Sequence, residues 1–236
     1  MRWSTIARLR LSFAILAVVV GAAVAGCSDS QPSSSQPERD RPVEHAAPSD
    51  RPRVVILGDS LTAGLGLPAN LAYPALLQRR IDGAGLNYEV VNAGVSGDTT
   101  AGGLRRLDWA LSDDVRVLVV ALGANDGLRG LPVGEVRRNL STIVARARDR
   151  GVQVLLAGME APPNVGREYT DAFREVYREV ARREDVPLIP FLLVGVAGES
   201  GLNQPDGIHP NPAGAERLAE TVWRALEPML NSATTP

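Results

Sequence analysis

From Arg53 onward, short apolar runs alternate with longer stretches in which apolar residues recur every three or four positions. The runs are nearly continuous, which is typical of strands that are covered on both faces. They predict five strands, at residues 53–58 (RVVILG), 88–92 (YEVVN), 116–122 (RVLVVAL), 152–158 (VQVLLAG) and 187–190 (PLIP).

The stretches with a period of three to four residues predict helices. Three are clear, at residues 135–150, 168–183 and about 213–230. Their apolar faces are formed by Val136, Leu140, Ile143, Val144 and Ala147 in the first, by Tyr169, Phe173, Val176, Tyr177 and Val180 in the second, and by Leu218, Ala219, Val222 and Leu226 in the third.

Strands that alternate with helices predict an α/β fold, a doubly wound parallel sheet of five strands. Residues 51–232 suit one such domain, followed by a short tail at 233–236. In sheets of this kind, binding sites lie beyond the carboxyl ends of the strands. The segments expected there are polar and rich in glycine: GDSLTAG (58–64), NAGVSGDTT (92–100), LGANDGLRG (122–130) and, before the last helix, DGIHPN (206–211).

The amino-terminal part has a different character. Arg2, Arg8 and Arg10 precede or flank the apolar run 11–26 (LSFAILAVVVGAAVAG), which is followed by Cys27. A basic start, a short apolar segment and small residues before a cleavage point are typical of a secretory signal. The alternative is an uncleaved membrane anchor, but 16 apolar residues fall short of the ~20 that span a bilayer.

The end of this run, Val24-Ala25-Gly26-Cys27, resembles a bacterial lipobox. The resemblance implies a signal peptide at 1–26, an acylated Cys27, export, and attachment to the cell envelope through the lipid. Residues 28–50 are rich in Ser, Pro and charge, with little to bury, and we expect a disordered tether that includes His45. Its length corresponds to a reach of roughly 25 Å.

Composition excludes several classes of function. All 25 basic residues are Arg, so a P-loop lysine, a Schiff-base lysine and a Ser–Lys dyad are excluded. The two histidines (His45, His209) and single cysteine (Cys27) make a dedicated metal site improbable. Cleavage before Cys27 leaves 22 basic and 27 acidic residues, a charge of −5, so neither nucleic acid nor anionic lipid is an expected partner.

Ser60, in the first polar loop, has three interpretations. A phosphate-binding turn would need the G-x-G-x-x-G spacing or a lysine, and both are missing. An N-cap is common for Ser at a turn from strand to helix. The third interpretation is a nucleophile: Asp206 and His209 stand three residues apart, and His209 is the one histidine in the predicted domain. His209 could take the Ser60 proton while Asp206 orients the imidazole ring.

The four polar segments resemble the conserved blocks of the SGNH, or GDSL-type, hydrolase family, from about Arg53 to about Met229. The similarity is greatest to the bacterial periplasmic acyl-thioesterase/lysophospholipase and arylesterase group, with YPALLQRR, REYTDAF and DVPLIPF in support. Ala124 departs from the glycine of that group. The resemblance implies a three-layer α/β/α sandwich with a flavodoxin-like parallel sheet.

It also implies a catalytic set and a set of acyl-chain contacts. Ser60 matches the nucleophile, His209 the general base, Asp206 its orienting partner, and Ser60, Gly97 and Asn125 the oxyanion hole. The acyl contacts correspond to Gly127, Leu128, Arg129, Gly130 and Leu131.

Other polar residues near these loops are expected to have structural roles. Asp59 and Asp126 should bind backbone N–H groups, Asp98 should cap a helix, and Arg129 suits loop scaffolding better than steering of an acidic substrate. Residues 191–205 (FLLVGVAGESGLNQP) could form a second acyl-binding wall or pack in the core.

We therefore expect a monomeric, exported, lipid-anchored serine esterase that needs no cofactor or metal and acts on carboxylic esters or thioesters, with lysophospholipids among the candidates. Two alternatives stay open: an O-acetylesterase or acyltransferase acting on surface glycans, and a binding module without catalysis on the same scaffold.

Overall fold

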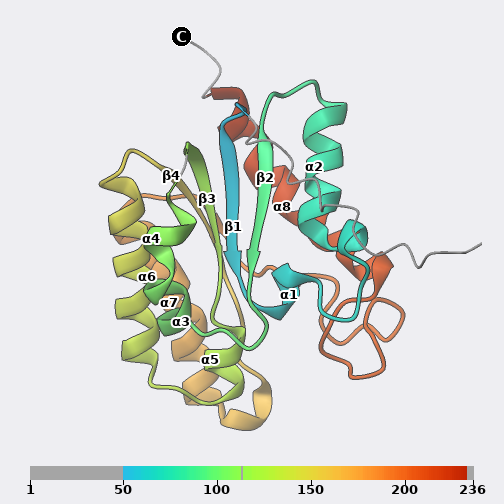
Figure 1. Cartoon of the computed structure of the whole chain (residues 1–236). Helices are drawn as coiled ribbons and strands as arrows, with labels where there is room; N and C mark the ends of the chain where they lie inside the picture. The colour runs from blue at the N-terminus through green and yellow to red at the C-terminus, as the bar shows by residue number, and fades with distance from the viewer. Residues whose placement is uncertain (1–49, 113, 233–236) are drawn as a thin grey trace, which may run out of the picture. The chain divides into compact units, whose positions relative to one another are not determined.

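A five-stranded parallel sheet forms the centre of the part of the chain that the computed structural model describes, residues 50–112 and 114–232 (Figure 1). The strand order is β2-β1-β3-β4-β5. The strands are β1 (Arg53–Gly58), β2 (Glu89–Gly94), β3 (Val115–Ala121), β4 (Gln153–Ala157) and β5 (Leu188–Ile189). Because Gly58 is in register with both Gly94 and Ala121, the carboxyl ends of the three strands β2, β1 and β3 lie side by side.

Helices cover both faces of the sheet (Figure 1). On one face α2 packs against α8, and on the other α6 packs against α3 and α7. The α-helices are α1 (Ser60–Ala63), α2 (Tyr73–Gly83), α3 (Thr100–Arg105), α4 (Leu107–Ala110), α5 (Ala124–Leu128), α6 (Val133–Arg148), α7 (Arg167–Glu184) and α8 (Pro212–Ser232). Two single 3₁₀ turns, η1 (Ala69–Leu71) and η2 (Pro163–Val165), complete the described elements.

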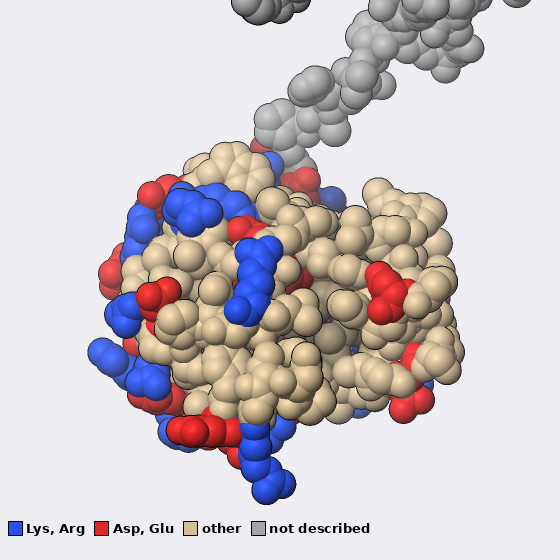
Figure 2. Space-filling view, turned by 90° about the horizontal axis from the view of Figure 1, so that it is seen from below, with Lys and Arg blue, Asp and Glu red and all other residues tan. Residues whose placement is uncertain are grey.

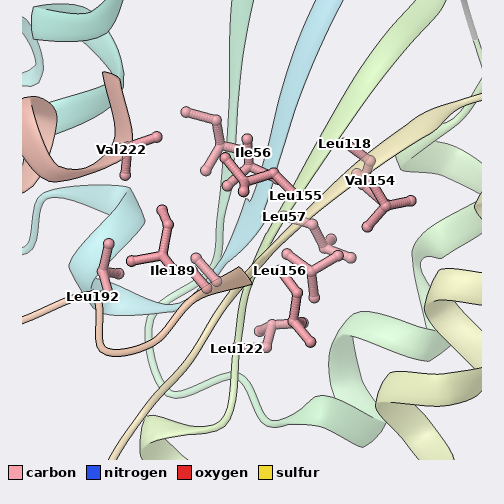
Figure 3. Packing of buried hydrophobic residues seen from close by; sticks show 14 of the residues in the cluster. Ile56, Leu57, Leu118, Leu122, Val154, Leu155, Leu156, Ile189, Leu192 and Val222 are labelled. Carbon is pink, nitrogen blue, oxygen red and sulfur yellow. The ribbon is translucent and has the colours of Figure 1, made fainter. Parts of the chain in front are cut away.

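The core lies on both sides of the sheet, because successive side chains of a strand point to opposite faces. Figure 3 shows Ile56 of β1 on the same side as Val222 of α8, and Leu57 on the other side with Leu156 of β4. All four side chains are fully buried. This double coverage is why the strands read as continuous apolar runs.

The predicted architecture is confirmed. All five expected strands are present within a few residues of their predicted limits, and the three predicted helices are α6, α7 and α8. Val136, Leu140, Ile143 and Val144 are all buried on the inner face of α6. Periodicity did not identify α1, α3, α4 and α5, because helices of four to six residues have too few turns to show a repeat. The eleven-residue α2 was also not predicted, although one of its faces is buried.

The predicted signal peptide, Cys27 and nearly all of the tether lie outside the described residues, as does the tail at 233–236. In residues 50–112 and 114–232, no helix combines the length and apolar character that crossing a membrane requires.

Candidate active site

Ser60, His209 and Asp206 form a continuous chain of hydrogen bonds at the carboxyl edge of the sheet. Ser60 is the first residue of α1, two positions after the end of β1, and its Oγ lies 2.9 Å from His209 Nε2. His209 Nδ1 lies 2.7 Å from Asp206 Oδ2. With a proton on Nδ1, the imidazole donates to the carboxylate, and Nε2 is left free to accept the Ser60 hydroxyl proton.

Asp206 is held in its ionised form by the turn that it begins. Its Oδ1 accepts hydrogen bonds from the backbone N–H groups of His209, at 3.0 Å, and Ile208, at 2.9 Å. The His209 backbone N–H, the His209 ring and the Ile208 N–H together lower the Asp206 pKa to about 2. The carboxylate is therefore charged over the whole pH range in which the protein could act.

Gln204 connects the loop that carries His209 to the loop that follows Ser60, although the two loops are far apart in sequence. Its side-chain amide donates to the Leu65 carbonyl at 2.7 Å and to the Pro210 carbonyl at 3.0 Å. The Gln204 N–H donates to the His209 carbonyl at 2.7 Å. These bonds explain how a side chain 149 positions from Ser60 reaches it. Gln204 was not identified from the sequence, since an isolated Gln in a loop carries no signal.

Gly97 and Asn125 come to the same edge from the loops after β2 and β3. The Val95 N–H donates to the Gly58 carbonyl at 3.0 Å, so the β2 loop lies against the end of β1. Gly97 has a φ of 81°, in the left-handed region of backbone conformations. Glycine adopts this conformation more readily than other residues because it has no Cβ. The Asn125 side-chain amide donates to the Asp98 carbonyl at 2.9 Å and reaches Asp59 Oδ2 at 3.5 Å.

Comparison with known proteins assigns this arrangement to a family. The model of the GDSL-like Lipase/Acylhydrolase family matches residues 56–217. The chain belongs to this family. Its relatives include Esterase TesA of Pseudomonas aeruginosa (47% identical over 75% of this chain and 89% of that protein) and the Arylesterase of Vibrio mimicus (37%, over 77% and 91%). Thioesterase 1/protease 1/lysophospholipase L1 of Escherichia coli is 38% identical over 75% of this chain and 85% of its own length.

Among solved structures, the crystal structure of TesA superposes on this GDSL-type hydrolase with a TM-score of 0.73 and 46% sequence identity. The match covers 75% of this chain and 99% of that one. The TesA chain in that crystal therefore corresponds almost entirely to part of the present chain.

Asp59, not Ser60, caps the first helix of the hydrolase. Asp59 Oδ1 accepts a hydrogen bond from the Leu61 N–H at 3.0 Å. The interpretation of Ser60 as the N-cap is therefore wrong, and its hydroxyl is left to His209. The expectation that Asp59 binds a backbone N–H is confirmed.

The Asp59 carboxyl is fully buried, and burial raises its pKa to about 6 although the Leu61 N–H opposes the shift. The folded protein thus binds this proton more tightly than the unfolded chain. The stability that results is complete below about pH 4 and is lost as the pH rises through about 6.

Asp59→Asn keeps an acceptor for Leu61 but cannot ionise. The free energy of unfolding of the variant, relative to the native protein, should therefore increase by about 2–3 kcal/mol between pH 4 and pH 7. Urea denaturation of both proteins at a series of pH values measures this difference. The contributions of titrating groups that both proteins share cancel when the two free energies are subtracted. A difference that does not change with pH would contradict the buried, titrating carboxyl.

Arg106 joins three of the segments that form the edge. Its guanidinium donates to Asp98 Oδ2 at 2.7 Å, to the Ala93 carbonyl at 2.7 Å and to the Gly58 carbonyl at 2.8 Å. These contacts hold the ends of β1 and β2 against the loop that carries Gly97. Sequence reasoning missed Arg106 because three partners in separate segments become visible only in the folded chain.

Asp126 links the helix that carries Asn125 to the start of α3. It is buried and accepts hydrogen bonds from the Thr100 N–H at 2.9 Å and the Thr100 hydroxyl at 2.6 Å. Its expected binding to a backbone N–H is confirmed. The prediction for Asp98 is wrong, because the N-cap of α3 is Thr99, whose side chain accepts from Gly102 N, while Asp98 pairs with Arg106.

The structure brings the predicted acyl-contact segment to the same edge. Gly127 and Leu128 lie in α5, and Arg129, Gly130 and Leu131 follow it. Arg129 donates to the Gly97 carbonyl at 3.0 Å, as expected for a residue that scaffolds the loop. In segment 191–205, Leu192 and Val196 are buried in the core, which favours packing over a second acyl-binding wall.

Among the residues that the structure describes, no three His, Cys, Asp or Glu side chains come together in a way that could hold a metal ion.

Proposed function

We propose that this chain is a serine esterase of the TesA type that hydrolyses carboxylic esters or thioesters, with lysophospholipids among its substrates, through an acyl-enzyme on Ser60. The observation that carries the proposal is the hydrogen-bonded chain from Ser60 through His209 to Asp206. It lies beside the point between β1 and β3 where the strand order reverses, the place where open α/β sheets bind their ligands.

In the first step Ser60 Oγ attacks the acyl carbon while its proton passes to His209 Nε2. The carbonyl oxygen becomes negative in the tetrahedral intermediate. His209 then gives its proton to the departing alcohol or thiol as the bond to that group breaks. Water attacks the acyl-enzyme in the same way: His209 takes its proton and returns it to Ser60 as the carboxylic acid leaves. Asp206 stays ionised and stabilises the imidazolium in both halves.

The negative oxygen needs fixed donors. We assign this role to the N–H groups of Ser60 and Gly97 and to the Asn125 amide. One Asn125 N–H is held at 2.9 Å by the Asp98 carbonyl, which fixes the side chain. The contact of the same amide to Asp59 at 3.5 Å is long for a hydrogen bond. The second N–H of Asn125 can therefore donate to a stronger acceptor, such as an oxyanion.

A burst experiment tests the proposal. With p-nitrophenyl butyrate in excess, one equivalent of nitrophenol should appear rapidly before steady turnover. An alkylphosphonate should label Ser60 and abolish this burst. A binding module would give neither the burst nor the label.

A series of esters and thioesters with acyl chains of 2 to about 16 carbons would then define the preferred chain length and leaving group. A preference confined to acetyl groups on glycans would favour the surface-glycan alternative.

We also propose that the enzyme is exported, anchored through Cys27, and active as a monomer. The basic start, the apolar run and the lipobox-like ending support export and anchoring, and a site built from one chain supports the monomer.

Cys27→Ala should abolish incorporation of radioactive palmitate and move the protein from the lipid-modified membrane fraction, because no other cysteine can be acylated. Esterase activity per molecule should be retained. Palmitate labelling that persists in the variant would contradict the anchor.

A further inference from the structure

The loops that form the candidate active site carry an unusual share of exposed apolar side chains. Six large apolar side chains stand out as exposed in the part of the chain that the structure describes. Four of them belong to these loops: Leu65 (47% exposed), Val95 (49%), Leu128 (48%) and Ile208 (48%). We call these four residues the apolar rim.

Each residue of the apolar rim comes from a different segment of the chain and lies next to the proposed catalytic residues. The Leu65 N–H donates to the Ser60 carbonyl at 3.1 Å, and the Val95 N–H to the Gly58 carbonyl at 3.0 Å. Ile208 precedes His209, and its N–H donates to Asp206 at 2.9 Å. Leu128 lies in α5, the helix that carries Asn125.

The other two exposed apolar side chains lie elsewhere. Trp109 (66% exposed) adjoins Arg53 and Val115, at the opposite edge of the sheet, and Val194 (56%) adjoins α8. Trp109 therefore offers a control for apolar exposure that is remote from the site.

The face that carries the apolar rim is poor in charge. Figure 2 looks onto the carboxyl edge of the sheet, and uncharged residues cover most of its centre, around a hollow. A basic side chain stands beside the hollow, while most other charged side chains lie farther out. Two charged residues of the site loops are already engaged: Asp206 with His209, and Arg129 with the Gly97 carbonyl. From Asp50 onward the chain has 20 Arg and 23 acidic residues, so attraction to an anionic surface is not expected.

The recess behind the reacting groups is too small for a fatty acyl chain. It is lined by Ser60, His209 and Tyr73 among others and has a volume of about 10 Å³, room for at most one water molecule. This recess therefore cannot hold the chain of a long ester, whereas the apolar rim is exposed on the open face.

We propose that the apolar rim docks on the surface of a zwitterionic phospholipid layer, so that the active site receives its substrate directly from the lipid. The occupant follows from the half-exposed apolar side chains on four segments, the mostly uncharged centre of the face and the net negative charge, which together fit a neutral interface better than an anionic one. The biological use rests on the proposed esterase function, but the docking itself needs no catalysis.

The test uses residues 50–236, the part that includes the match to the TesA crystal chain, with Ser60→Ala to prevent hydrolysis. A cooperative thermal unfolding transition checks that this part is folded. Binding to phosphatidylcholine vesicles is measured by flotation. Leu65→Gln and Ile208→Gln should each weaken partitioning about five- to tenfold, and the double variant more, because each removes an apolar side chain from the lipid. Trp109→Gln, the matched control, should stay within about twofold of the parent.

Melting temperatures within a few degrees of the parent confirm that the variants fold. Equal loss in Trp109→Gln, no binding to phosphatidylcholine, or binding only when phosphatidylglycerol is added would overturn the proposal. A dimer in sedimentation equilibrium that the Leu65→Gln change dissociates would instead show that the face pairs two copies of this chain. Failure of the esterase proposal would appear as a missing burst and would leave vesicle binding unchanged.

Discussion

Ser60→Ala is expected to lower kcat for p-nitrophenyl butyrate by about 10⁴–10⁶, with little change in the melting temperature. In the proposed mechanism the hydroxyl forms the acyl-enzyme, and it lies 2.9 Å from His209 Nε2. His209→Ala should cost a similar factor, because a serine hydroxyl is too weakly acidic to attack without a base. The double variant should be little worse than either single one, since both disable the same step.

The pH profile distinguishes the base from its neighbours. His209 must be neutral to accept a proton, so kcat/KM should rise with pH and then level. Asp206 cannot cause this rise, since its pKa is lowered to about 2. Asp59 can contribute, because burial raises its pKa to about 6.

The same profile measured in Asp59→Asn separates the two groups. If the rise belongs to His209, it persists in this variant. A rise that disappears with Asp59, or a His209→Ala enzyme that keeps near-full turnover, would refute the assignment of the base.

Asn125→Ala is expected to lower kcat by about 10²–10³ with little change in KM. In the proposed mechanism the amide donates to charge that exists only in the transition state, so its loss should leave ground-state binding almost intact. Steady-state kinetics with p-nitrophenyl butyrate measure both constants, and thermal unfolding checks the fold.

Asn139→Ala is the matched control for this prediction. It removes an amide from the neighbouring hydrogen bonds of Thr100 and Asp126, where Asn139 donates to the Thr100 hydroxyl at 3.1 Å, but it removes no proposed oxyanion donor. Its kcat should stay within a few-fold of the native value. If Asn125→Ala behaves like this control, Asn125 has no part in the mechanism.

Much of the fold could be predicted because burial leaves a periodic trace in the sequence. The strand at 53–58 was recognisable as a continuous apolar run because both of its faces are buried. Helix α6 was recognisable by its repeat of three to four residues because only one of its faces is buried. The candidate residues Ser60, Gly97, Asn125, Asp206 and His209 could be named because their loops resemble the blocks of a known family, and because the carboxyl ends of parallel strands meet at one edge.

Only the tertiary structure decided the roles that depend on distant partners. Asp59 reads as an ordinary polar turn residue, and its raised pKa follows from burial that several segments produce together. Arg106 has three partners in the β1, β2 and α3 regions, and Gln204 has one in the serine loop. The apolar rim likewise combines four loops. Local sequence records what a residue does to its own helix or strand, whereas burial and hydrogen bonding between segments arise only when the chain has folded.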